Sequence, residues 1–270
     1  MQAAPALHIN RITDSIHNMR LQAHAMNHSY DAVFLYFENE QETLSVAYPV
    51  HIKFLEDHKT SHPSLLIKQG NMLIGNEEPQ LLSEQFAAFT GKAFFPVEMF
   101  FAPGGSFGSL YNYEQLKKNW AAVKEHALLQ FEGEAVTIGL QQVENFFSRA
   151  DTLEKCFAAH PFFAFFFSVI YWNRKIESAP GIKLLLPIVP HSPVVSFEGK
   201  RSFSFADEGK MNISIIAACT DERSFEKIFY AKTALPDKAE LPVQGSLELE
   251  YEVYEKTGIL SSVTGWVSLQ

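Results

Sequence analysis

The stretch that decides the fold is Thr43–Leu55, TLSVAYPVHIKFL, in which apolar side chains occupy every second position. A period of two is typical of a strand with one buried and one exposed face, as in an antiparallel sheet. Because Pro49 has no N–H, we expect this strand to lie at a sheet edge or to bend there. The alternating side chains are Leu44, Val46, Tyr48, Val50, Ile52 and Phe54.

Strand patterns continue on both sides of this stretch. Residues 32–37, AVFLYF, are the expected hairpin partner, with a turn at 38–41. Residues 7–28 fit either a helical stripe or an edge strand. Further strands are expected at 65–68, 72–74 and 94–102.

A second set of strands occupies the last third of the chain. Its clearest member is a hairpin of residues 245–255 and 259–269, in which Glu248 alternates with apolar neighbours so that one face is core and one is water. The triplet Gly199-Lys200-Arg201 is interpreted as a turn between two strands. The other expected strands are 183–188, 194–198, 202–206 and 211–219.

Helical periodicity is confined to the middle of the chain. Asn112 is the expected cap of the longest helix, with Gln115 as its reciprocal partner in a capping box. Pro161 is expected to kink or split the last helical stretch. The expected helices span 79–89, 112–131, 136–149, 152–159 and 162–172.

The order of elements, strands then helices then strands, predicts an α+β fold. Antiparallel sheet or sheets would form from the N- and C-terminal strand sets, with the central helical segment packed on one face. We expect a single domain over 1–270. Proline-rich residues 176–193 mark a possible subdivision, into a strand-then-helix part (1–175) and a C-terminal β part (194–270).

The composition excludes several classes of protein. The 270 residues carry 31 acidic and 22 basic side chains and a formal net charge of −9, so nucleic acid is not an expected partner. Two cysteines, Cys156 and Cys219, cannot build a disulfide framework. No apolar run reaches the roughly 20 residues of a membrane span. The first eight residues lack the features of a signal peptide, so a cytoplasmic location is expected.

Phenylalanine is the unusual component, with 24 residues gathered in pairs and runs. Residues 157–172, FAAHPFFAFFFSVIYW, are too apolar on all sides for a helix that covers one face of a sheet. They therefore form an aromatic core, a wall of a cavity for an apolar ligand, or a subunit interface. The candidate ligand or interface residues are Phe162, Phe163, Phe165, Phe166, Phe167, Tyr171, Trp172, Trp120 and His160, with Tyr171 and His160 as polar anchors.

One short motif matches a catalytic pattern. Gly104-Gly105-Ser106-Phe107-Gly108 fits G-x-S-x-G, in which a strained strand-to-helix turn exposes a nucleophilic serine. A strand is expected before it, but the next helix begins only near Asn112, and no acid and histidine follow at recognisable positions. We therefore favour a glycine-rich turn and keep Ser106 as the candidate nucleophile.

Cofactor and metal motifs are scarce. His24 and His28 would share one face if this segment were helical, as a pair of metal ligands does. No phosphate-binding loop and no patterned Cys and His set accompanies them. The sequence therefore predicts no cofactor, with His24 and His28 as the candidate metal ligands.

Three functions remain open. The first is a non-catalytic intracellular binding or structural protein, an accessory factor or subunit of a larger assembly, that meets a protein partner or a second copy of itself. The second is a carrier or sensor that holds an apolar small molecule in a pocket lined by the phenylalanine-rich segment. The third is a serine hydrolase that uses Ser106.

Overall fold

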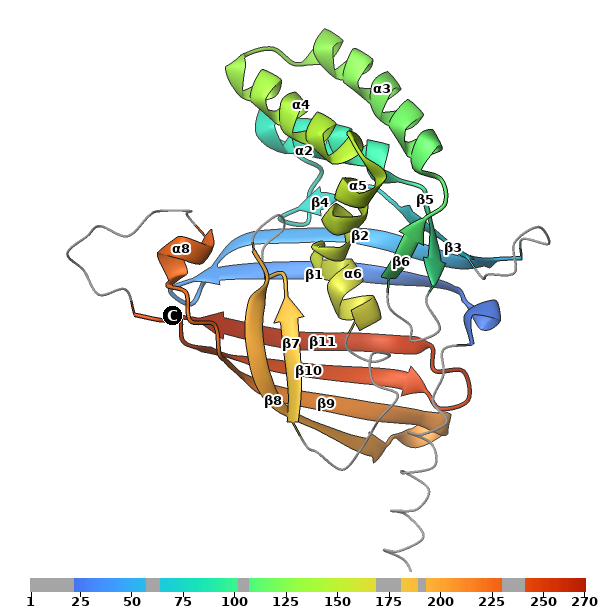
Figure 1. Ribbon diagram of the computed structural model, residues 1–270, viewed down its shortest axis with the longest axis vertical. Coiled ribbons are helices and arrows are strands. Elements are labelled where there is room, and N and C mark those ends of the chain that lie inside the picture. Colours follow the sequence, from blue (N-terminus) through green and yellow to red (C-terminus); the bar gives the residue numbers. More distant parts are fainter. Residues whose placement is uncertain (1–21, 57–63, 102–106, 169–180, 189–192, 230–240) are drawn as a thin grey trace, which may run out of the picture. The chain divides into compact units, whose positions relative to one another are not determined.

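The computed structural model describes residues 22–56, 64–101, 107–168, 181–188, 193–229 and 241–270. These residues form two compact units. The N-terminal unit contains residues 23–101 and 108–156, and the C-terminal unit contains the described residues from Phe157 onward together with Gln22 and Phe107. Each unit is built on one antiparallel sheet, which confirms the α+β fold class with N- and C-terminal strand sets (Figure 1).

The sheet of the N-terminal unit has the strand order β1-β2-β3-β5-β6, with the short β4 paired to β2. The β1–β2 hairpin forms as expected, because Asn39 and Glu40 take the positive φ angles of 50° and 65° that a two-residue turn needs. The strands are β1 (Asn27–Glu38), β2 (Gln41–Leu55), β3 (Ser64–Gln69), β4 (Leu73–Ile74), β5 (Val97–Phe101) and β6 (Phe107–Leu110).

Pro49 lies inside this sheet, so the expectation of an edge strand was wrong. Strand β2 pairs with β1 along its length, and β3 and β4 share its other side. Pro49 falls in the gap between these two partners, where the carbonyl of Pro49 accepts a hydrogen bond from Gly70 N–H. The missing N–H therefore costs no bond of the sheet ladder.

One face of the N-terminal sheet contributes to an apolar core. The cross-strand pair Ile52 and Ile67 is fully buried, and the pair Ile67 and Val97 extends this row to the next strand. On the other face of the same strands lie polar side chains such as the exposed Lys53. The period of two in the sequence thus predicts the buried face correctly.

The helices of the N-terminal unit pack through aromatic side chains. Trp120 stacks on Phe147 with ring centroids 5.6 Å apart and an interplanar angle of 7°. Phe94 lies against the same Phe147 ring, at 4.8 Å. The helices are η1 (Ala23–Ala25), α2 (Leu82–Gly91), η2 (Lys92–Phe94), α3 (Tyr113–Gln130), α4 (Glu134–Phe147) and α5 (Ala150–Ala158), which crosses the boundary between the units.

Two local expectations about helix starts were wrong. The α2 helix begins three residues after Pro79, where the Glu84 carboxylate accepts the N–H of Gln80 and of Leu81. Asn112 stands at the N-cap of α3 but does not cap it, because its side-chain oxygen accepts the N–H of Glu98. The Asn112 side chain therefore joins the helix start to β5 instead of closing the helix end.

The C-terminal unit contains a five-stranded sheet in the order β11-β10-β9-β8-β7. On β10 the apolar residues are buried and Glu248, Glu250 and Glu252 point to the opposite face, as the alternation predicts. We call the buried face the inner face and the other the outer face. The strands are β7 (Gly181–Leu186), β8 (Val195–Phe205), β9 (Lys210–Cys219), β10 (Gly245–Tyr254) and β11 (Leu260–Leu269), and the short helices are α6 (Pro161–Phe163), η3 (Ala164–Ser168), η4 (Asp207–Gly209) and α8 (Phe225–Phe229).

Strand β8 is continuous where the sequence suggested a turn. Gly199, Lys200 and Arg201 all pair with β9 and lie in the middle of the strand. A Cβ atom at Gly199 would stand 2.1 Å from the carbonyl oxygen of Ile216 and 2.4 Å from Cα of Ala217, so only glycine allows this close approach. Figure 1 shows β8 curving along its length, so the glycine serves a bend within a strand.

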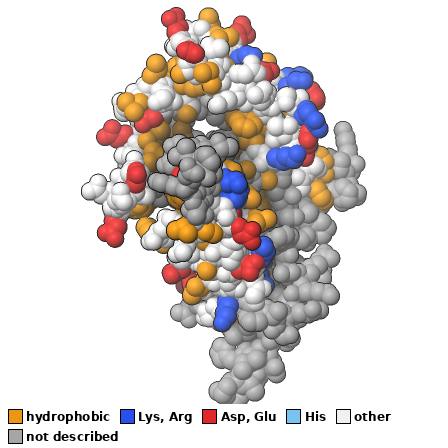
Figure 2. Space-filling view, turned by 60° about the vertical axis from the view of Figure 1, so that its left-hand side comes forward, with side chains coloured by type: hydrophobic (Ala, Val, Ile, Leu, Met, Phe, Trp, Pro, Cys, Tyr) orange, Lys and Arg blue, Asp and Glu red, His pale blue; other side chains and the backbone are white. Residues whose placement is uncertain are grey.

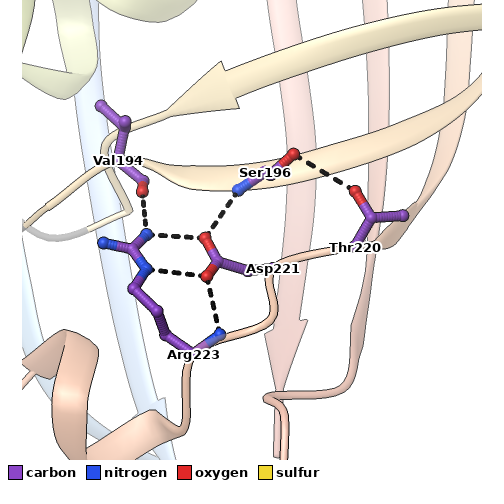
Figure 3. Close-up of polar contacts among 5 residues, drawn as sticks. All are labelled: Val194, Ser196, Thr220, Asp221 and Arg223. Carbon is purple, nitrogen blue, oxygen red and sulfur yellow. Dashed lines mark hydrogen bonds and ion pairs between the residues drawn. The ribbon is translucent and has the colours of Figure 1, made fainter.

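An ion pair between the buried Asp221 and the half-buried Arg223 links the start of β8 to the segment after β9 (Figure 3). The Arg223 guanidinium donates two bonds to the Asp221 carboxylate, at 2.7 and 2.6 Å, and a third to the carbonyl of Val194 at 2.6 Å. Asp221 also accepts the backbone N–H of Ser196 at 3.2 Å. Asp221 is therefore charged, buried and fully bonded, which is the condition under which a buried ion pair stabilises a fold.

The substitution Asp221→Asn is expected to lower the free energy of unfolding by about 2 kcal/mol near neutral pH, because it leaves the Arg223 charge without its partner. Hydrogen bonds from the Arg223 side chain hold the pKa of Asp221 at about 2, against an ordinary 3.8. A lowered pKa in the folded state contributes stability above the ordinary pKa and loses it as pH falls toward about 2. Urea unfolding at several pH values should therefore show the variant and the wild type converging in acid.

The matched control is Asp151→Asn, which removes an exposed carboxylate paired with Arg149 at 2.9 Å. Exposed pairs contribute little, so this variant should unfold close to the wild type at every pH. Equal losses in the two variants would contradict the structural role of Asp221.

Candidate functional site

The phenylalanine-rich segment is enclosed from Phe162 to Phe167, the part whose side chains the structure describes. Phe166 and Phe167 expose 2% and 1% of their surface, Phe162 and Phe163 are also buried, and Phe165 is half-buried. The η3 segment, a single turn of π-helix, lies against β11 within the C-terminal unit. Its side chains therefore belong to the interior of that unit and present little free surface.

Pairwise ring contacts explain how this segment packs. Phe162 stacks on Phe166 with ring centroids 5.4 Å apart, and Phe163 stacks on Phe167 at 6.0 Å. Phe166 and Phe167 meet edge to face at 4.7 Å. Residues four apart share one side of a helical turn, so two stacked pairs form side by side.

His160 and Pro161 set the start of this turn. The ring nitrogen Nδ1 of His160 accepts the backbone N–H of Phe162 at 3.2 Å, and Pro161 occupies the first helical position. The His160 ring also meets Phe163 edge to face at 5.7 Å. These contacts give His160 a structural place as a cap, while its part as a polar anchor for a ligand stays a prediction.

Trp120 has its partners elsewhere in the fold. It lies in the N-terminal unit, stacked on Phe147, and its indole N–H donates to the Glu144 carboxylate at 2.9 Å. Lys124 donates to the same Glu144 oxygen at 2.6 Å. The hydrogen bonds from Lys124 and Trp120 lower the pKa of Glu144. The described contacts of Trp120 thus hold α3 to α4.

Several predicted site residues lie outside the described residues, namely Ser106, Tyr171 and Trp172. The surroundings of Ser106 are informative all the same. The next described element after β5 is the neighbouring strand β6, and helix α3 begins only at Tyr113. A nucleophile elbow requires a helix directly after the serine.

The candidate metal ligands His24 and His28 do not share a helix. His24 is exposed on the short η1, whereas His28 is the second residue of β1. Across the residues that the structure describes, no three His, Cys, Asp or Glu side chains come together as a metal site would require. None of the described helices is long and apolar enough to cross a membrane.

The Cys156 thiol is poorly suited to act as a nucleophile. Burial raises its pKa to about 12. Only the thiolate form of cysteine is a strong nucleophile, so Cys156 stays protonated and unreactive at neutral pH.

A site that sequence reasoning missed lies on the edge strand β1. Val33, Leu35 and Phe37 expose 57%, 51% and 42% of their surface. They alternate with the half-buried Phe34 and Tyr36, so these three point to one side of the strand. We call Val33, Leu35 and Phe37 the β1 outer face.

Among the described strands, β1 is the last one at its side of the sheet. Strand β1 stands at the end of its sheet, and its partner in the described part of the chain is β2. An edge strand presents a row of N–H and C=O groups that a further strand can bond. Leucines are also exposed on helices, such as Leu128 and Leu129 of α3, but a helix satisfies its own interior backbone groups. Among the described edge strands, β1 is 12 residues long and carries three exposed apolar side chains on one side.

The sequence contains the signal for this surface. A half-buried strand alternates apolar with polar residues, but residues 32–37, AVFLYF, are apolar at all six positions. Such a run predicts a strand covered on both faces, whereas here one face stays exposed. Figure 2 shows acidic side chains spread over the face that it draws, with hydrophobic ones exposed between them.

Comparison with models of protein families, with curated proteins and with solved structures finds no match for this chain.

The enclosed phenylalanines yield a prediction about stability. Phe167→Ala should lower the free energy of unfolding by about 3–5 kcal/mol, because it removes a fully buried ring that its neighbours cannot replace. Phe165→Ala, at the half-buried position, is the control and should cost distinctly less. Urea unfolding followed by circular dichroism measures both. A Phe167→Ala variant as stable as the wild type would show that the segment is not core.

Proposed function

We propose that this chain is a non-catalytic subunit of a protein assembly and that it joins a second copy of itself through the open edge of β1. The observation that supports this proposal is the β1 outer face, whose exposed apolar side chains lie on the strand that ends the sheet among the described residues. The same strand has 12 residues, about 40 Å of edge at the usual rise per residue.

Natural proteins usually protect such edges with charges, proline or a covering segment. The central run of β1, residues 32–37, contains no charged residue and no proline. In the C-terminal unit, by contrast, edge strand β7 has Lys183 on its outer face, paired with Glu198 at 3.1 Å. An uncharged, exposed edge is therefore a feature that a covering strand would explain.

The second copy of β1 is a suitable partner because an apolar run pairs with itself in antiparallel register. Two β1 strands would bring their apolar centres together, and two-fold symmetry would limit the contact to a dimer. Pairing would satisfy backbone groups and bury the three exposed side chains in one step. The same chain would then present its other surfaces twice, which suits a scaffold or an accessory subunit.

The test is the molecular mass in solution over a range of protein concentrations, measured by light scattering and sedimentation. The wild type should form a dimer, and Leu35→Lys should weaken it at least about tenfold, because a charge would be buried at the centre of the contact. Ile216→Lys is the matched control, since Ile216 is 62% exposed on the outer face of the other sheet. It should leave the mass unchanged.

Amide hydrogen exchange adds a second measurement. In the dimer the outward N–H groups of β1 should exchange slowly, and Leu35→Lys should release them. A wild type that stays monomeric at every concentration would overturn the proposal. So would slow exchange of all β1 amides in a monomeric sample, because the covering strand would then belong to the same chain.

A further inference from the structure

One cation lies on the inner face of the C-terminal sheet, among apolar side chains. Arg201 shares its side of β8 with Phe197 and Phe203 and pairs with Ile215 of β9. The next residue in this cross-strand row is Leu249 of β10. Ile215 and Leu249 are buried, so Arg201 borders a dry apolar interior.

Arg201 has an aromatic neighbour but no counter-ion. Its guanidinium carbon lies 5.1 Å from the centroid of the Phe203 ring. Among the described residues, no carboxylate pairs with Arg201 and no oxygen accepts its N–H groups. The cations Lys210 and Arg223, by contrast, each bond a carboxylate, at 2.7 and 2.6 Å.

The sheet geometry explains why none of the described carboxylates lies beside Arg201. The nearest glutamates along β10, Glu248 and Glu250, flank Leu249 and therefore project from the outer face. Burial lowers the pKa of Arg201, and no acidic group opposes this effect. A partly desolvated cation without a partner is unfavourable, so a bound anion would stabilise this position.

Arg201 is half-buried, at the side of the apolar interior. Among the described residues, the pairing of β7 with β8 runs from Leu186 and Val195 to Gly181 and Lys200, next to Arg201. Beyond this point the inner-face side chains of β8 are only half-buried, although their β9 and β10 neighbours are buried. A ligand placed here would keep its polar group near water and its apolar part near the core.

We propose that Arg201 binds the anionic head group of an amphipathic small molecule whose hydrocarbon chain lies along Phe203 and the neighbouring inner-face residues. The planar guanidinium can donate two parallel bonds to a carboxylate or a phosphate. Phe203 covers one side of the guanidinium and provides an apolar surface for the chain. This site is separate from β1, so it stands whether or not the chain dimerises.

The test compares three ligands with the same alkyl chain, namely decanoate, decyl phosphate and decanol, by titration calorimetry below their aggregation limits. The wild type should bind at least one of the two anions about tenfold or more tightly than the alcohol. Arg201→Met should abolish this preference and leave decanol binding unchanged. Whichever anion binds more tightly identifies the head group as carboxylate or phosphate.

Lys200→Met is the matched control, because Lys200 directly precedes Arg201 on β8 and is exposed on the outer face. It should bind all three ligands like the wild type. Equal loss of anion binding in the two variants would show general attraction to charge and would overturn the proposal. Absence of any anion preference in the wild type would overturn it as well.

Thermal unfolding provides a second measurement, made without and with the anion. Arg201→Met should unfold at the same or a higher temperature than the wild type, because it removes a half-buried charge that lacks a partner. The anion should raise the unfolding temperature of the wild type and not that of the variant. A variant that is strongly destabilised would reveal a structural partner for Arg201 and would exclude the ligand site.

Discussion

Each backbone N–H and C=O group inside this protein needs a hydrogen-bond partner, and this need shapes both sheets. Both sheets are antiparallel, so each interior strand must bond a neighbour on either side. Pro49 is accommodated inside β2 because it faces the gap between β3 and β4, and Gly199 keeps β8 and β9 in contact through a bend. At β1, which ends its sheet among the described strands, the same requirement favours pairing with a further strand.

The second constraint is the cost of charge inside an apolar fold. Asp221 and Arg223 reduce this cost together, since they form an ion pair and each also bonds the backbone. Arg201 does not meet it within the described residues, although it belongs to the same sheet. The contrast separates a cation that holds the fold together from one that is suited to a ligand.

The sequence predicted those parts of the fold that follow from periodicity. The strand around Ile52, the hairpin of β10 and β11 and the helix α3 were all expected, because alternation and helical stripes are local signals. Gly199-Lys200-Arg201 has the composition of a turn, because glycine next to charged residues is typical of turns. Only the three-dimensional structure shows that β9 approaches Gly199 too closely for any other residue.

The candidate sites were harder to predict than the fold. The phenylalanine run was noticed for its composition, yet its rings mostly fill the interior. The run at residues 32–37 was recognised as a strand, but its place at a sheet edge depends on which strands pair. The lack of a glutamate beside Arg201 follows from the direction of the β10 side chains, which place the glutamates on the outer face. Neither property is local, so neither could be derived from spacing alone.

The division of the chain into units has a consequence for its synthesis. The N-terminal unit is almost contiguous, from residue 23 to residue 156, whereas most of the C-terminal unit follows it. A ribosome therefore completes the first sheet while the second is still unmade, and domains fold as they emerge. Strand β1 is therefore made early, and the pairing proposed for it would be accessible to neighbouring nascent chains on the same messenger RNA.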